Sequence, residues 1–234
     1  MIRKYRICGI VVECEFRFPT MTARAEKYLS AEGEPELVIP FDEERIRQVS
    51  RDTGLSADDC EIVITAEEFY RSLPERGGFM LHSSAVALDG RAYLFSAPSG
   101  TGKSTHTSLW LEAFGERAVI LNDDKPAIMI RGGAVTACGT PWSGKSDLNI
   151  NAEFPLQGIC ILGRSAENHI EPLPADRAVY PLLDQTIRPA DSAGMDALLT
   201  CIDEVASKVP IWQMGCNMSV EAAQTAYRSM SRHY

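Results

Sequence analysis

A predicted strand, a glycine-rich loop and a predicted helix follow one another directly at residues 91–114, and this succession constrains the fold more than any other segment. The loop, residues 97–104, reads Ala-Pro-Ser-Gly-Thr-Gly-Lys-Ser. It matches the phosphate-binding pattern Gly-x-x-x-x-Gly-Lys-Ser/Thr at every fixed position except the first, where Ala97 stands. The segment therefore predicts an α/β fold that binds a nucleoside triphosphate.

The loop and the residue that follows it supply the predicted nucleotide ligands. In such loops the backbone N–H groups point at phosphate oxygens, Lys103 would reach the outer phosphates, and the Ser104 hydroxyl would ligate Mg²⁺. ATP and Mg²⁺ are the expected cofactors, although the sequence does not distinguish ATP from GTP or pyrophosphate. Ala97 fits the loop if its φ is negative, whereas a positive φ would strain it. The predicted binding residues here are Ser99, Gly100, Thr101, Gly102, Lys103, Ser104 and Thr105.

Composition limits the classes of partner. The 234 residues are 45% hydrophobic and 24% charged, enough for a sizeable core in one large domain, or in one domain with a small extension. A net charge of −9 disfavours nonspecific binding to nucleic acid or to an anionic membrane. The seven cysteines are scattered and never spaced Cys-x-x-Cys, which favours reduced thiols and a cytoplasmic location. No apolar run approaches the length of a membrane span.

The strand that enters the loop is expected to pair with the strand before it. Asp89-Gly90 separates two apolar runs, residues 81–88 and 91–96, and this is a strong hairpin signal. A helix over residues 104–114, closed by Gly115, should follow the loop. Because an antiparallel neighbour differs from the usual parallel nucleotide-binding sheet, we expect a mixed sheet.

The remaining pattern predicts a small β-rich extension over residues 1–75 and a nucleotide-binding catalytic domain over residues 76–234. Further elements are expected as strands at 5–18, 37–41, 118–121, 158–162 and 211–214, a hairpin of 127–130 with 134–138, and helices at 42–51, 175–185 with Pro181 as a kink, 195–208, and 220–234 capped by Ser219.

Two carboxylates, Asp123 and Asp124, stand at the end of the strand predicted at 118–121, only 20 positions after Lys103. One could hold Mg²⁺ while the other accepts a proton from an incoming hydroxyl, and the sequence does not assign the two roles. A solvated turn is the alternative.

Other candidates depend on weaker patterns. His82 lies on the strand paired with the one that delivers the loop, so it could approach the terminal phosphate or serve only as a strand residue. The loop at 139–145 offers a cation, Lys145, and an aromatic platform, Trp142, and it could be a lid over nucleotide or substrate, or a structural turn. Arg164, just past a strand, could neutralise phosphate charge.

His82, the hairpin, the loop at 99–104 and the Asp123-Asp124 doublet together resemble the catalytic domain of HPr kinase/phosphorylase and its relatives of the phosphoenolpyruvate carboxykinase-like P-loop fold. The resemblance covers residues 81–127, and residues 139–145 look like an uncharacterised subgroup that includes proteins suspected of acting beside peptide-modification systems. The resemblance to HPr kinase/phosphorylase implies that Lys103 and Ser104 bind ATP and Mg²⁺ and that His82 lies near the reacting phosphate. It also implies that the two aspartates bind metal and act as base. No counterpart of the HPr-recognition segment follows the aspartates, so HPr itself is not the expected substrate.

The sequence thus predicts a kinase that transfers the γ-phosphate of ATP to a hydroxyl of serine, a peptide or a small alcohol, and it leaves open whether the chain forms a homo-oligomer. An ATP-binding sensor without phosphotransfer is one alternative, and it gains if Asp123 points away from the phosphates. A carboxykinase-like lyase is another, although the sequence has no clear His/Lys metal set.

Overall fold

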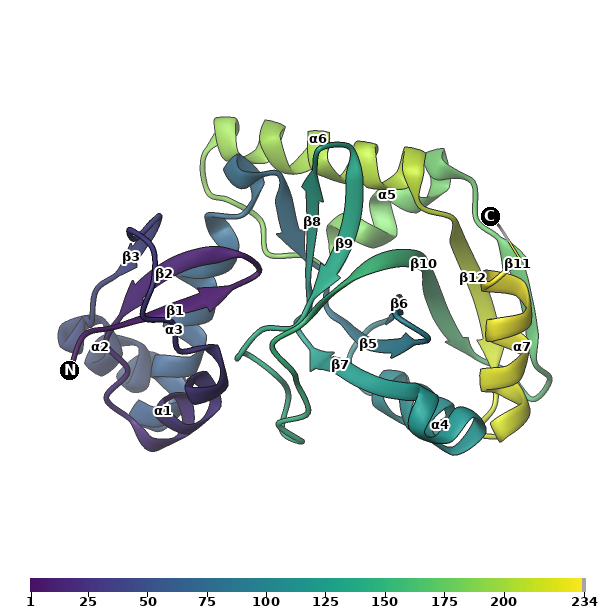
Figure 1. The fold of residues 1–234 in the computed structure, drawn as a ribbon, viewed down its shortest axis with the longest axis horizontal. Helices are drawn as coiled ribbons and strands as arrows, with labels where there is room; N and C mark the ends of the chain where they lie inside the picture. The colour runs from purple at the N-terminus through teal and green to yellow at the C-terminus, as the bar shows by residue number, and fades with distance from the viewer. Residues whose placement is uncertain (233–234) are drawn as a thin grey trace.

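Two β-sheets organise the chain in the computed structural model, which describes residues 1–232 (Figure 1). A nine-stranded mixed sheet forms the larger part, and a three-stranded sheet, β1-β2-β3, lies in the N-terminal part. The elements in chain order are β1 (Arg3–Ile7), β2 (Ile10–Cys14), α1 (Pro19–Ala25), η1 (Glu26–Tyr28), β3 (Leu37–Ile39), α2 (Glu43–Thr53), α3 (Ala57–Arg71), η2 (Pro74–Arg76), β4 (Gly78–Met80), β5 (Ser83–Leu88), β6 (Arg91–Ser96), α4 (Lys103–Phe114), η3 (Gly115–Arg117), β7 (Ala118–Asp124), β8 (Ala127–Arg131), β9 (Ala134–Cys138), β10 (Glu153–Arg164), β11 (His169–Pro172), α5 (Ala175–Asp184), α6 (Ser192–Lys208), β12 (Ile211–Cys216) and α7 (Val220–Met230).

The hairpin that delivers the loop is present as predicted. β5 and β6 pair antiparallel through the turn at Asp89-Gly90, with Ser84 opposite Phe95. On its other side β6 pairs in parallel with β10, and β5 pairs antiparallel with β7. The sheet is therefore mixed, and the strand that carries the loop lies inside it.

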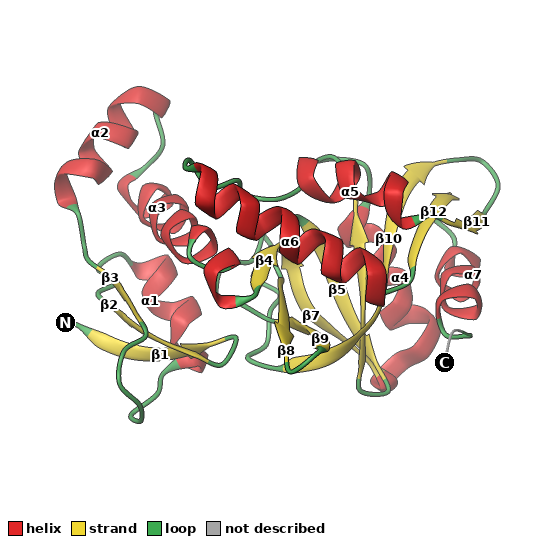
Figure 2. Cartoon of the chain, turned by 90° about the horizontal axis from the view of Figure 1, so that it is seen from above, coloured by secondary structure: helices red, strands yellow, loops and turns green. Residues whose placement is uncertain are grey.

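Helices cover both faces of the large sheet. Alternate residues of β6 face opposite ways: Leu94 packs in a core with α5 and α6, and Phe95 packs in a core with α4 and α7. Figure 2 shows α6 lying lengthwise along the sheet with α5 beside its end. On the other face Trp110 of α4 contacts Phe95 and Tyr227. No helix within residues 1–232 is both long and apolar enough to cross a membrane.

The N-terminal part differs from the prediction. The strand expected at residues 5–18 is two strands, β1 and β2, joined by a tight turn at Cys8-Gly9. The expected β-rich character is wrong, because α3 alone has 15 residues whereas β1 and β2 have 5 each. The helix expected at 42–51 is confirmed as α2, and its cap, Asp42, accepts a hydrogen bond from the backbone N–H of Arg45.

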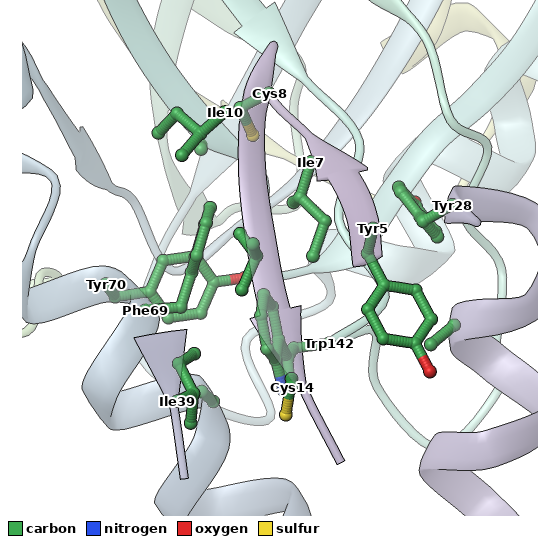
Figure 3. Packing of buried hydrophobic residues seen from close by; sticks show 14 of the residues in the cluster. Tyr5, Ile7, Cys8, Ile10, Cys14, Tyr28, Ile39, Phe69, Tyr70 and Trp142 are labelled. Atoms are coloured by element: carbon green, nitrogen blue, oxygen red, sulfur yellow. The ribbon is translucent and has the colours of Figure 1, made fainter. Parts of the chain in front are cut away.

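One aromatic core joins the N-terminal part to the rest of the chain. Trp142 packs with its ring stacked on Phe69 of α3 at 4.8 Å between centroids, and its indole N–H donates to the Thr65 hydroxyl at 3.0 Å. Figure 3 shows Trp142 among residues of β1, β2 and α3. Met129 of β8 and Cys138 of β9 belong to the same cluster, so this core crosses the predicted division at residues 75 and 76.

Two element ends also differ. β7 continues through Asp124, so both aspartates lie within the last residues of the strand and not after it. The helix predicted at 220–234 ends at Met230, and positions 233–234 of that prediction lie outside the described residues. Ser219 stands at the cap position of α7, but its hydroxyl donates to Asn217 and does not cap the helix.

Candidate functional site

A cavity of about 610 Å³ opens where the loop, the end of β7 and the segment after β9 meet. Most of the predicted site residues line it. The lining consists of His82, Ser99, Gly100, Gly102, Lys103, Ser104, Thr105, Asp123, Asp124, Gly144, Lys145 and Ser146. Residues from four separate stretches of the sequence therefore meet in one site.

The loop itself has the backbone that its sequence requires. Gly100 and Gly102 have φ values of 78° and 122°, which a side chain would strain, and α4 begins immediately afterwards at Lys103. Ala97 is not among the described non-glycine residues with positive φ, so the alanine in the first position of the motif carries no strain. Because the free N–H groups and the positive end of the α4 dipole lie at this end of the helix, the site favours an anion.

Lys103 is buried at 8% exposure, and its ammonium group donates to the carbonyl oxygen of Ala97 at 2.9 Å. Burial lowers the pKa of Lys103, and the charges of Asp124 and Asp123 oppose this shift. The charge of Lys103 is thus poorly hydrated and lies near two carboxylates. An anion that enters the cavity would give it a stronger partner than a carbonyl.

Asp123 is the more buried of the two carboxylates, with 8% exposure. Its Oδ1 accepts from the hydroxyl of Ser84 on β5 at 2.7 Å, and Ser84 is bonded in turn to Thr107 of α4. Its Oδ2 accepts from the hydroxyl of Ser146 at 2.9 Å. Buried hydroxyls thus fix one oxygen, while the other faces a hydroxyl in the cavity.

Asp124 lies between two cationic or titratable partners. Its Oδ1 is 3.4 Å from Nε2 of His82, and its Oδ2 is bonded to the ammonium of Lys125. Burial alone would raise the pKa of Asp124, but the hydrogen bond from His82 and the charge of Lys125 outweigh it and hold the pKa at about 2. Asp124 therefore stays ionised at any physiological pH.

A glutamine orients His82. Nδ1 of His82 is 2.9 Å from Oε1 of Gln185, and the backbone N–H of His82 donates to the backbone carbonyl of Gln185 at 2.7 Å. The side-chain amide of Gln185 donates from Nε2 to Asp184, so its oxygen is the atom that faces the histidine. Nδ1 therefore carries a proton that it donates to Gln185, and Nε2 faces the Asp124 carboxylate, which is an acceptor as well. The sequence reasoning missed Gln185, and no motif pointed to it.

The predicted loop at 139–145 divides into a buried and an exposed part. Trp142 is 1% exposed and belongs to the N-terminal core, so the suggested aromatic platform over a ligand is wrong: stacking on Phe69 removes the ring from the cavity. Lys145 is exposed and lies on the cavity lining. Ser146, which follows it, lines the cavity too and was missed, because a lone serine in a polar loop gives no signal.

Arg24 holds this segment in place from the N-terminal part. Its guanidinium donates to the carbonyl oxygens of Ser143 at 2.9 Å and Gly144 at 3.2 Å, and it pairs with the Asp147 carboxylate at 3.2 Å. Lys27 donates to the carbonyl of Asn149 in the same segment. The N-terminal part is therefore joined to the candidate site by hydrogen bonds as well as by the aromatic core.

Arg164 is in a different position from the one predicted for a phosphate ligand. Its guanidinium donates to the carbonyl oxygens of Gly100 and Thr101, which occupies it with the back of the loop. It lines a second cavity of about 480 Å³, together with Thr101, His106 and Met218, and not the cavity of the aspartates. The two cavities share Gly100, Gly102 and Thr105, so they lie on either side of the loop.

The family model described as SynChlorMet cassette protein ScmC matches residues 55–221. The chain belongs to this family. The matched range includes every residue that lines the two cavities. No curated protein matches the chain. Among solved structures, one titled as the Hpr(Ser) kinase/phosphatase from Coxiella burnetii matches with a TM-score of 0.37 and 9% identity, over 65% of this chain and 98% of that one.

Proposed function

We propose that this ScmC-family protein is an ATP- and Mg²⁺-dependent phosphotransferase that transfers the γ-phosphate to a hydroxyl group of serine, a peptide or a small alcohol. The observation that supports this most is that one cavity gathers Lys103 and Ser104 at the start of α4 with the carboxylates of Asp123 and Asp124. Phosphoryl transfer needs these components: donors for the phosphates, oxygen ligands for a metal ion, and a base near the acceptor.

The residues present fit a triphosphate. The glycine backbone, the N-terminus of α4 and the buried ammonium of Lys103 all favour an anion on one side of the loop. The second cavity, on the other side of the same loop, is large enough to receive part of a nucleoside. The triphosphate would follow the loop from one cavity to the other, with Thr105 lining both.

The residues also fit Mg²⁺. The ion prefers oxygen ligands and keeps several waters, so one or two carboxylates and substrate phosphates suffice to hold it. Ser104 and Asp124 would hold it here, because the Ser104 hydroxyl is exposed on the cavity lining and Asp124 remains ionised with its pKa at about 2. When bound, Mg²⁺ supplies charge neutralisation at the transferring phosphoryl group.

Asp123 is the better candidate for the base. A carboxylate whose pKa is near 2 is a weak proton acceptor, which counts against Asp124. Asp123 already accepts a hydrogen bond from a hydroxyl in the cavity, that of Ser146, and this is the contact that an acceptor hydroxyl would make. Ser84 holds the opposite oxygen, so the carboxylate keeps its orientation during proton transfer.

Three further side chains have proposed roles at the site. His82, with its Nδ1 proton held by Gln185, keeps Nε2 beside Asp124 and so orients this carboxylate. Lys145, which is exposed and lines the same cavity, would approach the phosphates as they enter. We assign Arg164 the role of supporting the loop through its carbonyl groups instead of binding phosphate itself.

The alternatives predicted from sequence have less support. A sensor that binds ATP without transfer would be favoured if Asp123 turned away from the phosphate loop, but Asp123 lines the same cavity as Lys103. A carboxykinase-like lyase has less support because the sequence has no clear His/Lys metal set.

The test uses ATP labelled at the γ-phosphate, Mg²⁺, and a panel of serine, serine-containing peptides and small alcohols. The wild type should transfer label to one class of acceptor. Lys103→Ala should abolish transfer, while Lys208→Ala, an exposed lysine of α6 bonded to Glu204, should retain it. Equal transfer by Lys103→Ala and the wild type would overturn the proposal, and ATP binding without transfer to any acceptor would favour the sensor.

A further inference from the structure

Ser146 occupies the place in the cavity where an acceptor hydroxyl belongs. Its Oγ donates to Oδ2 of Asp123 at 2.9 Å, and Lys103 and Ser104 line the same cavity. Ser99, Ser104 and Thr105 also line it, but among the hydroxyls of this lining Ser146 is the one whose hydrogen bond goes to a carboxylate within residues 1–232. The chain thus presents a serine of its own to the carboxylate that we assign as base.

The backbone holds Ser146 in this position. Residues 144–147 form a tight turn in which the N–H of Asp147 donates to the carbonyl of Gly144 at 3.2 Å, with Lys145 and Ser146 at its two central positions. On one side of the turn the N–H of Gly144 donates to the carbonyl of Asp123, and on the other the N–H of Asp123 donates to the carbonyl of Leu148. Asp123 and the turn are therefore fixed relative to each other by main-chain bonds, and the hydroxyl has a defined approach to the carboxylate.

A purely structural role explains this serine poorly. The orientation of Asp123 is already fixed by Ser84, which is 1% exposed and bonds the other carboxylate oxygen. Ser146 is instead exposed, and it lines the cavity. The neighbouring Lys145 would place a positive charge beside any phosphate formed there.

We propose that Ser146 is a site of intramolecular autophosphorylation, and this rests on the phosphotransferase function proposed above. Oγ of Ser146 forms a bond to the γ-phosphorus of ATP as the bond from that phosphorus to the β,γ-bridging oxygen breaks. The hydroxyl proton passes to Oδ2 of Asp123, and ADP leaves with the bridging oxygen. The products are phosphoserine 146 and ADP, so no further reactant is needed.

The experiment incubates the full chain with ATP and Mg²⁺ and measures intact mass, followed by peptide mapping. We expect the mass of one added HPO₃ group, located on Ser146. The group should be absent from Ser146→Ala, appear as phosphothreonine in Ser146→Thr, and be unaffected in Ser207→Ala, a serine on the exposed side of α6. Because the reacting groups belong to one molecule, the first-order rate constant should not change with protein concentration.

The outcomes separate this proposal from the one on which it rests. Turnover of ATP, or transfer to an added acceptor, with Ser146 unmodified would overturn the autophosphorylation proposal and leave the phosphotransferase function standing. A label on another residue, or a rate constant that rises with protein concentration, would also overturn it. If calorimetry detects no binding of ATP with Mg²⁺, both proposals fail together.

Discussion

The side-chain oxygen of Gln185 lies 2.9 Å from Nδ1 of His82, although 103 residues separate the two in sequence. Gln185 stands just after α5, and its own backbone carbonyl also accepts from the N–H of His82. These two bonds fix both the position and the orientation of the ring that faces Asp124. A residue distant in sequence thus sets the geometry of the candidate site.

Removing this oxygen should impair turnover more than nucleotide binding. We expect Gln185→Leu to lower kcat by roughly tenfold to a hundredfold, because a misoriented ring misplaces Asp124. Its KM for ATP should change little, since Gln185 does not line the cavity. Gln185→Glu, which keeps an acceptor oxygen, should restore most of the rate. Nitrogen NMR of His82 should show a hydrogen-bonded Nδ1–H in the wild type that is lost in Gln185→Leu; unchanged spectra would contradict this role.

Arg24→Ala should weaken both the fold and the site. Three contacts of its largely buried guanidinium, to Ser143, Gly144 and Asp147, are lost at once. We expect the free energy of unfolding, from urea denaturation, to fall by about 2 kcal/mol. Arg24→Lys should not restore it, because an ammonium group cannot make the same forked set of bonds. The control is Arg47→Ala, whose exposed partner Glu43 lies one helical turn away; an equal loss there would contradict the assignment.

Trp142→Ala should cost about 3–5 kcal/mol of stability, as expected for a large aromatic residue removed from a core. The ring is 1% exposed and stacks on Phe69. Lys145→Ala, only three residues along the same loop, should leave the urea midpoint unchanged, because its side chain is exposed. An unchanged urea midpoint in Trp142→Ala would instead favour the lid that the sequence suggested.

His106 should make stability depend on pH. Burial lowers its pKa from 6.5 to about 4, and its Nε2 accepts from the indole N–H of Trp110. Between these pH values the unfolded chain binds a proton that the folded chain does not, so stability is full above about pH 6.5 and falls as pH drops towards 4. The loss attributable to this residue is about 3 kcal/mol. As the pH drops over this interval, the free energy of unfolding should fall less in His106→Phe than in the wild type. An identical decline in the two proteins would contradict the assignment.

The parts of the fold that short-range chemistry dictates were predictable from sequence. Asp89-Gly90 and the glycines before Lys103 favour particular backbone geometries, and the structure contains both the hairpin and the strand–loop–helix succession. α3 was missed because its run of β-branched residues conceals the helical period. Ser56, whose hydroxyl accepts from the N–H of Asp59, was an available signal for its start.

The contacts that complete the site were not predictable in this way. Gln185 reaches His82, Arg24 reaches Gly144, and Ser146 reaches Asp123 across 23 to 120 residues of sequence. Each partner is a common polar residue in a loop or at a helix end, and only the packing of the sheet and the N-terminal core brings it into place. Sequence therefore indicated the residues that carry charge at the site, and tertiary structure supplied the residues that position them.

The central claim is that the cavity between the loop and the two aspartates binds a triphosphate with Mg²⁺. Its most direct test is isothermal calorimetry with the β,γ-imido analogue of ATP and Mg²⁺, on the wild type, Lys103→Ala and Lys208→Ala. We predict saturable binding of one analogue per chain, weakened about thirtyfold (about 2 kcal/mol) in Lys103→Ala and unchanged in Lys208→Ala. Equal affinity of the wild type and Lys103→Ala, or no binding by the wild type, would contradict the account.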